Sequence, residues 1–203
     1  MRYRAFDTLA TLAFFYPRRG EYFKKELEAL ILYSLKTKTN PFSFKSSFAG
    51  AIGIPQFMPS NISKYGVDGN GDKKVDIVNN MSDAIYSVGN YLRKHGWKKG
   101  EPVAVKVRVK NNRYKNILKV SPCSQKKSNV KTLRKYGVAF PLWFNSKLVA
   151  SLYQVDIKNG KREFHVIFNN FCTIGKYNNS AKYILAVNYL GNRVGYRVGA
   201  VRR

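Results

Sequence analysis

Three neighbouring stretches decide how this 203-residue chain is read: SFAGAIGIPQFMPS (47–60), YGVDGNGDKKVD (65–76) and a segment that ends in HGW (95–97). The first is rich in small residues, which let another backbone or a ligand approach closely. The second places oxygen-bearing side chains at alternate positions. The third has the periodicity of an amphipathic helix. Together they predict a close-packed turn, an ion-binding loop and a helix in direct succession.

The composition is that of a foldable and strongly basic chain. With 44% hydrophobic and 14% aromatic residues, it can bury the core of one domain, or of a domain with a smaller lobe. No apolar run approaches the roughly 18 residues of a membrane span, and no signal-peptide pattern is visible. The net charge of +26 favours a polyanionic partner, either nucleic acid or the bacterial wall with its anionic polymers. The alternative is a solvated, lysine-rich surface.

The cysteines and histidines indicate little chemistry. Cys123 and Cys172 are too few for a disulfide framework or a cysteine zinc site. One disulfide and two ordinary thiols both remain open, and two thiols are expected. His95 lies in the last turn of a predicted helix and His165 in a strand pattern, so neither is assigned a catalytic role.

The N-terminal part predicts two helices that meet at a corner. Residues 5–16 form an apolar helical pattern, and Pro17 interrupts it or opens the next helix. A second apolar face follows with helical spacing: Phe23, Leu27, Leu30, Ile31 and Leu35. Arg18 and Arg19 therefore lie at a corner between helices. They form either a salt-bridged surface pair or a groove wall that donates hydrogen bonds.

The acidic stretch has the spacing of an EF-hand loop. Asp68, Asn70 and Asp72 supply oxygen side chains at positions one, three and five, and the Lys74 carbonyl falls at position seven. The sixth and twelfth positions depart from the pattern, with Lys73 in place of Gly and Asn79 in place of Glu. The sequence therefore predicts either a Ca²⁺ site or a merely hydrated acidic turn.

A helix follows the acidic loop. Ser82 is predicted to cap it and Gly96 to end it, with an apolar stripe of Ile85, Val88 and Leu92. Tyr91 lies beside this stripe. It is either a tyrosine at the edge of the core or a stacking or hydrogen-bonding wall for a ligand.

Beyond Trp97 the hydrophobic period changes to two. Residues 103–109, 149–157 and 164–168 alternate as half-buried strands, and Asn159–Gly160 predicts a hairpin turn. Residues 111–146 are polar, lysine-rich and carry no readable pattern. The fold class is therefore α+β, mainly helical, with a small antiparallel sheet in the C-terminal half, within residues 101–170.

One more helix closes the chain. Tyr177–Asn178 is predicted to open it, and its apolar face comprises Tyr183, Ile184, Val187 and Leu190. The sequence shows no internal repeat and no clear linker between domains.

Several motifs resemble those of the B-type membrane-bound lytic murein transglycosylases. They are DTLATLAF (7–14), YPRR (16–19), the central block, NF (170–171) and KYNNS (176–180). The resemblance is weakest between about residues 106 and 146. It implies a lysozyme-like fold and a partial catalytic domain over residues 1–203. Its parts would be a helical part (1–100) with the loop 68–83, a small β part (101–170) and a closing helix (171–203).

The resemblance also implies a reaction. The family cleaves the bond between N-acetylmuramic acid and N-acetylglucosamine in peptidoglycan and leaves a 1,6-anhydro sugar. One Glu serves first as acid and then as base, because the substrate supplies its own nucleophile. In the family this Glu lies in a Gly-Val-Glu-Thr-type turn before the segment that matches Arg2-Tyr3-Arg4. The catalytic Glu is therefore expected upstream of Met1, and Glu21, Glu26 and Glu28 lie on a helix that does not match it.

By the same resemblance, residues 47–56 floor a saccharide groove. Ser47 would orient the Glu, and the groove would be lined by Arg18, Arg19, Gln56, Tyr91, Tyr177 and Asn178. The Ca²⁺ ligands would be Asp68, Asn70, Asp72, the Lys74 carbonyl and, as the closing carboxylate, Asp83. Val78 stands where the family usually has Trp, which puts the local packing in doubt.

The expected partner is a peptidoglycan glycan strand, bound by a monomer in the periplasm or at the outer membrane. One alternative is a fragment that binds peptidoglycan without cutting it. The other is a basic nucleic-acid binder on an unrelated fold. That reading explains only the charge, because the chain has no recognition-helix, zinc-finger or RNA-binding motif.

Overall fold

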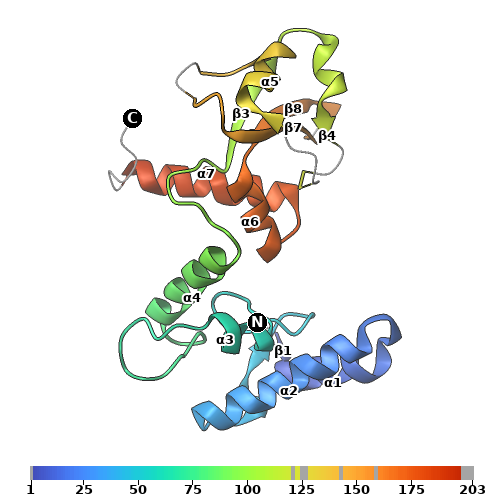
Figure 1. The fold of residues 1–203 in the computed structure, drawn as a ribbon. Helices are drawn as coiled ribbons and strands as arrows, with labels where there is room; N and C mark the ends of the chain where they lie inside the picture. Colours follow the sequence, from blue (N-terminus) through green and yellow to red (C-terminus); the bar gives the residue numbers. More distant parts are fainter. Residues whose placement is uncertain (1, 120–121, 124–127, 142–143, 158–159, 198–203) are drawn as a thin grey trace. The chain divides into compact units, whose positions relative to one another are not determined.

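The computed structural model describes residues 2–119, 122–123, 128–141, 144–157 and 160–197 (Figure 1). The chain divides into two compact units, Met1–Lys94 (unit 1) and His95–Arg203 (unit 2). Each unit is described by itself below. Among the described residues, no helix is both long enough and apolar enough to cross a bilayer.

Unit 1 is helical, and its only described sheet is a short antiparallel pair of strands. Its elements are β1 (Tyr3–Arg4), α1 (Ala5–Phe15), η1 (Pro17–Arg19), α2 (Gly20–Thr37), η2 (Pro41–Ser43), β2 (Lys45–Ser46), α3 (Pro59–Tyr65) and α4 (Met81–Lys94). The predicted helix at 5–16 and the corner at Pro17 are confirmed. A Cβ on Gly20 would lie 2.8 Å from the Ala13 carbonyl oxygen, so only glycine lets α2 start this close to α1.

The buried face of α2 differs from the predicted one. Ile31 and Leu35 are 38% and 69% exposed, whereas Glu26 and Ser34 are only 3% exposed. Glu26 accepts hydrogen bonds from the Ser60 backbone N–H and hydroxyl, both at 2.8 Å. Because its carboxylate is satisfied in this way at the start of α3, a charged residue can occupy the interior.

The predicted cap and stripe of α4 were also wrong. Asn80, and not Ser82, caps this helix, because its side-chain oxygen accepts from the N–H groups of Ser82 and Asp83. The buried residues of α4 are Asp83, Ala84, Ser87 and Tyr91, while Ile85 is 62% exposed. Small and polar residues take the inner face because α4 packs on the acidic loop and satisfies its backbone.

Unit 2 contains the predicted sheet. Its elements are β3 (Ala104–Val109), η3 (Asn112–Asn116), β4 (Leu118–Lys119), β5 (Ser128–Asn129), α5 (Val130–Lys135), β6 (Val138–Ala139), β7 (Val149–Asp156), β8 (Arg162–Ile167), α6 (Asn169–Tyr177) and α7 (Ala181–Arg197). The main path of the sheet is β4-β7-β8-β3-β6, and β5 pairs with β7. All described pairs are antiparallel except the short β4–β7 pair.

The β7–β8 hairpin is confirmed, although Asn159 of its predicted turn lies outside the described residues. One face of the sheet forms the core of unit 2 together with α5. Val130 and Leu133 from α5 pack with Leu152 and Val166 from the sheet, and all four are fully buried. The unreadable segment 111–146 thus supplies a core helix.

The start of the closing helix was predicted wrongly. Tyr177 is the last residue of α6 and Asn178 follows it, whereas α7 begins at Ala181. The nine-residue α6 directly follows a strand, so the sequence gives its start no separate signal. Of the predicted α7 face only Ile184 is buried, while Tyr183, Val187 and Leu190 are 36–63% exposed.

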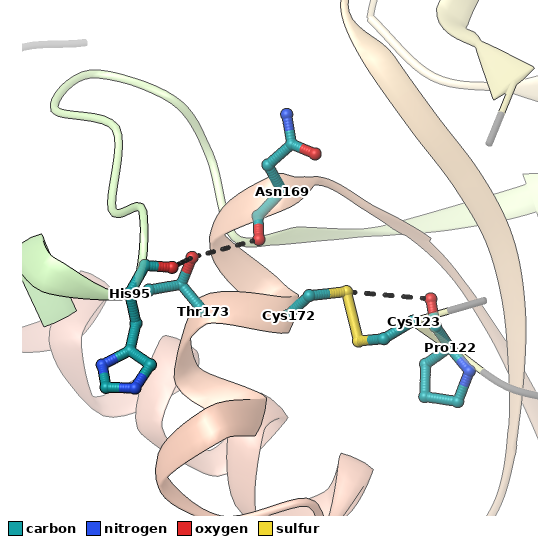
Figure 2. The surroundings of a disulfide bond; sticks show 6 residues. All are labelled: His95, Pro122, Cys123, Asn169, Cys172 and Thr173. Carbon is teal, nitrogen blue, oxygen red and sulfur yellow. Dashed lines mark hydrogen bonds between the residues drawn. A yellow bond between two sulfur atoms is a disulfide. The ribbon is translucent and has the colours of Figure 1, made fainter. Parts of the chain in front are cut away.

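The two cysteines form a disulfide, which corrects the expectation of two thiols (Figure 2). Cys123 and Cys172 have Cα atoms 5.6 Å apart, within the usual range for this bond. Two cysteines with a sequence separation of 49 residues carry no spacing signal, which is why the pairing could not be read from the sequence.

Asn170 is the polar anchor of unit 2. Its side chain is fully buried, accepts from the Lys98 N–H at 2.9 Å, and donates to the carbonyls of Lys98 and Glu101 at 2.9 and 2.8 Å. These three bonds hold the start of α6 to the segment that leads into β3.

We expect Asn170→Ala to lower the free energy of unfolding by about 3 kcal/mol, because it removes the three hydrogen bonds of a fully buried side chain and leaves a cavity in its place. Urea denaturation followed by far-UV circular dichroism measures this loss. Asn112→Ala, at an exposed position of η3, is the matched control and should change stability by less than about 0.5 kcal/mol. Equal losses in the two variants would contradict the anchoring role.

Candidate functional site

Within the small-residue stretch 47–60, residues 52–57 form a tight turn that is closed by backbone hydrogen bonds between its two ends. Ile52 and Phe57 exchange both backbone hydrogen bonds, N–H to carbonyl, at 2.8 and 3.1 Å. Gly53, inside this turn, has φ +72°, and a Cβ there would lie 2.5 Å from the Ile77 carbonyl oxygen. The Ile54 N–H donates to that same oxygen. The turn is therefore clamped against the end of the acidic loop, and only glycine fits at the contact.

Gln56 lies at the end of this turn in the left-handed region, with φ +52°. Its side chain is exposed, and its amide nitrogen donates to the Gly53 carbonyl at 3.0 Å. A non-glycine residue adopts this conformation only where its surroundings enforce it, and such positions cluster at functional sites. The turn thus holds an amide at the surface in a fixed place.

Ser47 begins the same stretch. Its hydroxyl oxygen accepts from the N–H groups of Ala49 and Ala51 at 3.3 and 3.2 Å. A hydroxyl has one proton to donate in addition to its two acceptor positions. Ser47 is therefore suited to donate to an incoming carboxylate.

Tyr91 lies beneath the turn rather than at the edge of a stripe. It is 6% exposed, and its ring centroid is 5.7 Å from that of Phe57 and 4.8 Å from that of Tyr65. Burial raises the pKa of its phenol above the ordinary value. Within unit 1, Tyr91 supports the turn as a core residue.

Arg18 and Arg19 are exposed in η1, at the predicted helix corner. Among the described residues neither forms an ion pair, so the salt-bridged alternative is not seen. The Arg19 guanidinium carbon lies 4.4 Å from the ring centroid of Tyr22 and 5.2 Å from that of Phe23. This cation–π stacking fixes the Arg19 side chain at an exposed position.

The remaining predicted residues belong to unit 2. Tyr177 is half-buried at the end of α6, and the exposed Asn178 accepts from the Ser180 N–H at 3.0 Å. In unit 1 the structure therefore places Ser47 at the start of the stretch whose later turn presents Gln56, with Tyr91 packed against Phe57 of that turn. In unit 2 it places Tyr177 and Asn178 next to each other at the end of α6.

The acidic loop is organised by its own carboxylates. Asp68 accepts from the N–H groups of Gly71, Asp72 and Lys73, and Asp72 accepts from Lys74 and from the Asn70 side chain. The hydrogen bond from Asn70 lowers the pKa of Asp72. The loop is thus held closed by bonds between its carboxylates and its backbone.

Asp83 closes the loop from α4. It is fully buried, and its two oxygens accept from the N–H groups of Gly69 and Asp76 at 2.8 and 2.7 Å. The carboxylates and amide here are the hard oxygen donors that Ca²⁺ prefers, so the donor chemistry fits that ion. Within the described residues, however, no three His, Cys, Asp or Glu side chains are placed to hold one ion together.

Three of the five glutamates, Glu21, Glu26 and Glu163, have polar partners of their own. Glu26 binds Ser60, and the Lys24 hydrogen bond lowers the pKa of Glu21. In unit 2 the hydrogen bond from Lys106 lowers the pKa of Glu163. A general acid at neutral pH needs a raised pKa. The lowered pKa values of Glu21 and Glu163 are the opposite of this requirement, and the Glu26 carboxylate is already engaged by Ser60.

The polar anchors Glu26, Asn80 and Ser87 were missed as positioning residues. Ser87 accepts from the Val67 N–H at 2.9 Å, and so ties α4 to the loop. The sequence offered one signal for two of them, namely their position on the helix. Glu26 and Ser87 lie at helical spacing from other residues that are buried in α2 and α4.

Comparison with known proteins identifies the family. Residues 1–192 match the model of the transglycosylase SLT domain. The chain belongs to this transglycosylase family. It is 39% identical over 191 residues to the membrane-bound lytic murein transglycosylase B of Escherichia coli K12, covering 94% of this chain and 51% of that protein. The chain therefore spans about half the length of this curated relative.

Solved structures of transglycosylases share the fold. The soluble lytic transglycosylase SltB1 of Pseudomonas aeruginosa superposes with a TM-score of 0.85 at 33% identity, over 97% of this chain and 64% of that one. The Escherichia coli lytic transglycosylase Slt35 gives 0.82 at 37% identity, over 97% and 60%. The predicted lysozyme-like α+β class and the predicted transglycosylase family are both confirmed.

We expect Asp83→Asn to destabilise the chain by about 2 to 3 kcal/mol, measured by urea unfolding with a calcium chelator present. An amide is neutral and offers a single acceptor oxygen, so one of the two N–H groups loses its acceptor and the other loses its charged partner. Asp156→Asn changes an exposed carboxylate on β7 in the same way and should have little effect. If both variants unfolded alike, Asp83 would not be the closing residue.

Proposed function

We propose that this chain forms the saccharide-binding part of a peptidoglycan lytic transglycosylase domain. The reaction would cleave the N-acetylmuramic acid–N-acetylglucosamine bond and leave a 1,6-anhydro-muramoyl product. The observation that carries this proposal is the clamped turn that presents Gln56, in a chain of the transglycosylase family. A related structure, SltB3 of Pseudomonas aeruginosa, is described in complex with NAG-anhNAM-pentapeptide; it is 32% identical, with a TM-score of 0.80 over 93% of this chain and 50% of that one.

Each of the predicted site residues would have its own role in binding the saccharide, set by its side-chain chemistry. The Gln56 amide would both donate to and accept from a sugar acetamide, and the guanidinium groups of Arg18 and Arg19 would donate to hydroxyls or to a muropeptide carboxylate. Tyr91 would hold the turn of Gln56 in place from the core of unit 1. Tyr177 and Asn178, in unit 2, are proposed as further saccharide-binding residues on the strength of the family motif KYNNS (176–180). Each contact would contribute more to affinity in a rigid site, because less conformational entropy of the side chains is lost on binding.

We place the catalytic acid outside the described glutamates, in a segment before Arg2. Two observations support this placement. Glu26 is buried against Ser60, and the pKa of Glu21 is lowered by Lys24, which is opposite to what a general acid requires. Ser47 would then orient the incoming carboxylate through its free hydroxyl proton. The alternative is a chain that binds peptidoglycan without cleaving it in any form.

We expect the purified 203-residue chain to sediment with insoluble peptidoglycan but to release little 1,6-anhydro-muropeptide, because a positioned acid contributes about 10²- to 10⁴-fold to the rate. Gln56→Ala should weaken sedimentation about fivefold, as expected for the loss of one or two hydrogen bonds. Gln154→Ala, on β7, is the matched control and should bind normally.

The same assay tests the placement of the acid. A chain extended upstream to include the family's Glu should cleave, and replacing that Glu by Gln should abolish cleavage while binding persists. If the 203-residue chain cleaved at a rate like the extended one, the placement would be wrong, and Glu21, Glu26 and Glu28 would be substituted next.

We also propose that the acidic loop binds Ca²⁺ through Asp68, Asn70, Asp72, the Lys74 carbonyl and Asp83. The support is the hard-oxygen donor set and the Escherichia coli Slt35 structure described in complex with calcium, which is 37% identical with a TM-score of 0.80. The ion would supply positive charge that stabilises the closed conformation of the acidic loop. The loop in turn contacts the turn of Gln56, because the Ile77 carbonyl accepts a hydrogen bond from the Ile54 N–H.

We expect millimolar Ca²⁺ to raise the melting temperature by several degrees, because an ion that binds only the folded state stabilises it by about 2.7 kcal/mol at a hundredfold excess over Kd. Asp68→Ala should remove this shift. Asp156→Ala should keep it, since that carboxylate lies in unit 2. An identical shift in the two variants would assign the ion to another site.

We infer that the chain works in the cell envelope. Its proposed substrate lies there, and the relative from Escherichia coli is named as membrane-bound. The Cys123–Cys172 disulfide supports this inference, because such bonds persist in oxidising compartments.

A further inference from the structure

Unit 2 contains a groove between the sheet and α7. Its volume is about 920 Å³, within the range of ligand sites. The sheet wall presents Lys106 from β3 opposite His165 from β8, with Glu163 on the same strand as His165. Asn188 of α7 donates to the Ala104 carbonyl at 3.1 Å and so fixes the helix at the strand edge. The two walls are therefore held at a set spacing.

The helix wall of this groove mixes apolar and polar side chains. Its apolar members are Leu185, Ala186 and Tyr189, and Tyr189 is 66% exposed. The neighbouring α7 residue Asn192 also lines the groove and adds an amide with two donors and an acceptor. An exposed aromatic ring beside amides suits a ligand that has both an apolar face and hydroxyl groups.

The charge of the groove differs from that of the chain. The chain carries +26, but the described lining has two lysines, Lys106 and Lys182, against two carboxylates, Asp156 and Glu163. Lys106 is ion-paired with Glu163. His165 Nε2 lies 3.4 Å from the other Glu163 oxygen, and burial lowers the His165 pKa, so the imidazole is neutral at neutral pH. A lining without net charge does not select a polyanion.

We propose that this groove binds a neutral sugar segment of a glycan strand, with Tyr189 stacking on the apolar face of a ring and Glu163 accepting from its hydroxyls. Carboxylate, amide and ammonium groups together provide the mixed donors and acceptors that neighbouring hydroxyls require. The choice of N-acetylhexosamine as the sugar rests on the proposed function. None of the residues assigned to the predicted groove of Gln56 and Asn178 lines this one.

The test is a titration of the isotope-labelled 203-residue chain with a short N-acetylglucosamine oligomer, followed by amide chemical shifts. We expect shifts at Val105, Lys106 and His165. Tyr189→Ala should raise the Kd read from these signals about five- to tenfold, as expected for a lost stacking contact. Tyr183→Ala is the matched control, because Tyr183 is an exposed tyrosine of α7, at 37%, that does not line the groove.

A second variant tests the polar wall. Glu163→Gln keeps the size of the side chain but removes its charge, and should weaken binding at the same amides while the rest of the spectrum stays folded. The proposal is overturned if millimolar oligomer leaves these amides unmoved, if Tyr183→Ala loses as much affinity as Tyr189→Ala, or if polyphosphate competes more strongly than the sugar. Signals near Gln56 report on the proposed function separately: Gln56→Ala should remove those and leave the groove signals intact.

Discussion

The buried carboxylate of Asp83 is the interaction on which the candidate site of unit 1 depends. A carboxylate without water is tolerated only when hydrogen bonds replace its hydration, and Asp83 receives them from Gly69 and Asp76, near the two ends of the acidic loop. Ile77 follows directly, and its carbonyl accepts from Ile54 in the turn that carries Gln56. A short chain of backbone contacts therefore leads from α4 through the loop to the proposed sugar-binding amide.

Polar anchors of this kind explain where the sequence could and could not be read. Apolar periodicity correctly predicted α1, the β3 strand and the β7–β8 hairpin. In each of them the buried face is made mainly of apolar side chains, which is the pattern that periodicity detects. It misplaced the inner faces of α2 and α4, where Glu26 and Ser87 are buried because each has a partner far along the chain. A single sequence does not show such partners, so periodicity assigns charged and hydroxyl residues to the surface.

The positions of the predicted site residues could also be read only in part from the sequence. Arg18 and Arg19 lie at an exposed corner between helices, as the sequence predicted, and Ser47 and Gln56 lie in one compact stretch; their roles stay predictions. Tyr177 and Asn178 were assigned to the start of a helix, although Tyr177 ends α6 and Asn178 follows it, because the nine-residue α6 has no turn signal before it. The groove beside α7 was not foreseen, since its lining comes from strands and a helix whose pairing the sequence does not specify.

Unit 2 positions its candidate residues by the same physical means as unit 1. Three polar or sulfur-bearing residues of α6 contact segments outside the helix. Asn170 binds the 98–101 segment, and Cys172 is bonded to Cys123. Thr173 adds a longer contact of 3.5 Å to the His95 carbonyl (Figure 2). In the chain-entropy description, a cross-link over 49 residues stabilises by about 4 kcal/mol. Because the helix is held near its start, the position of Tyr177 and Asn178 at its end is set by segments far away in the sequence, as the position of Gln56 is set by Asp83.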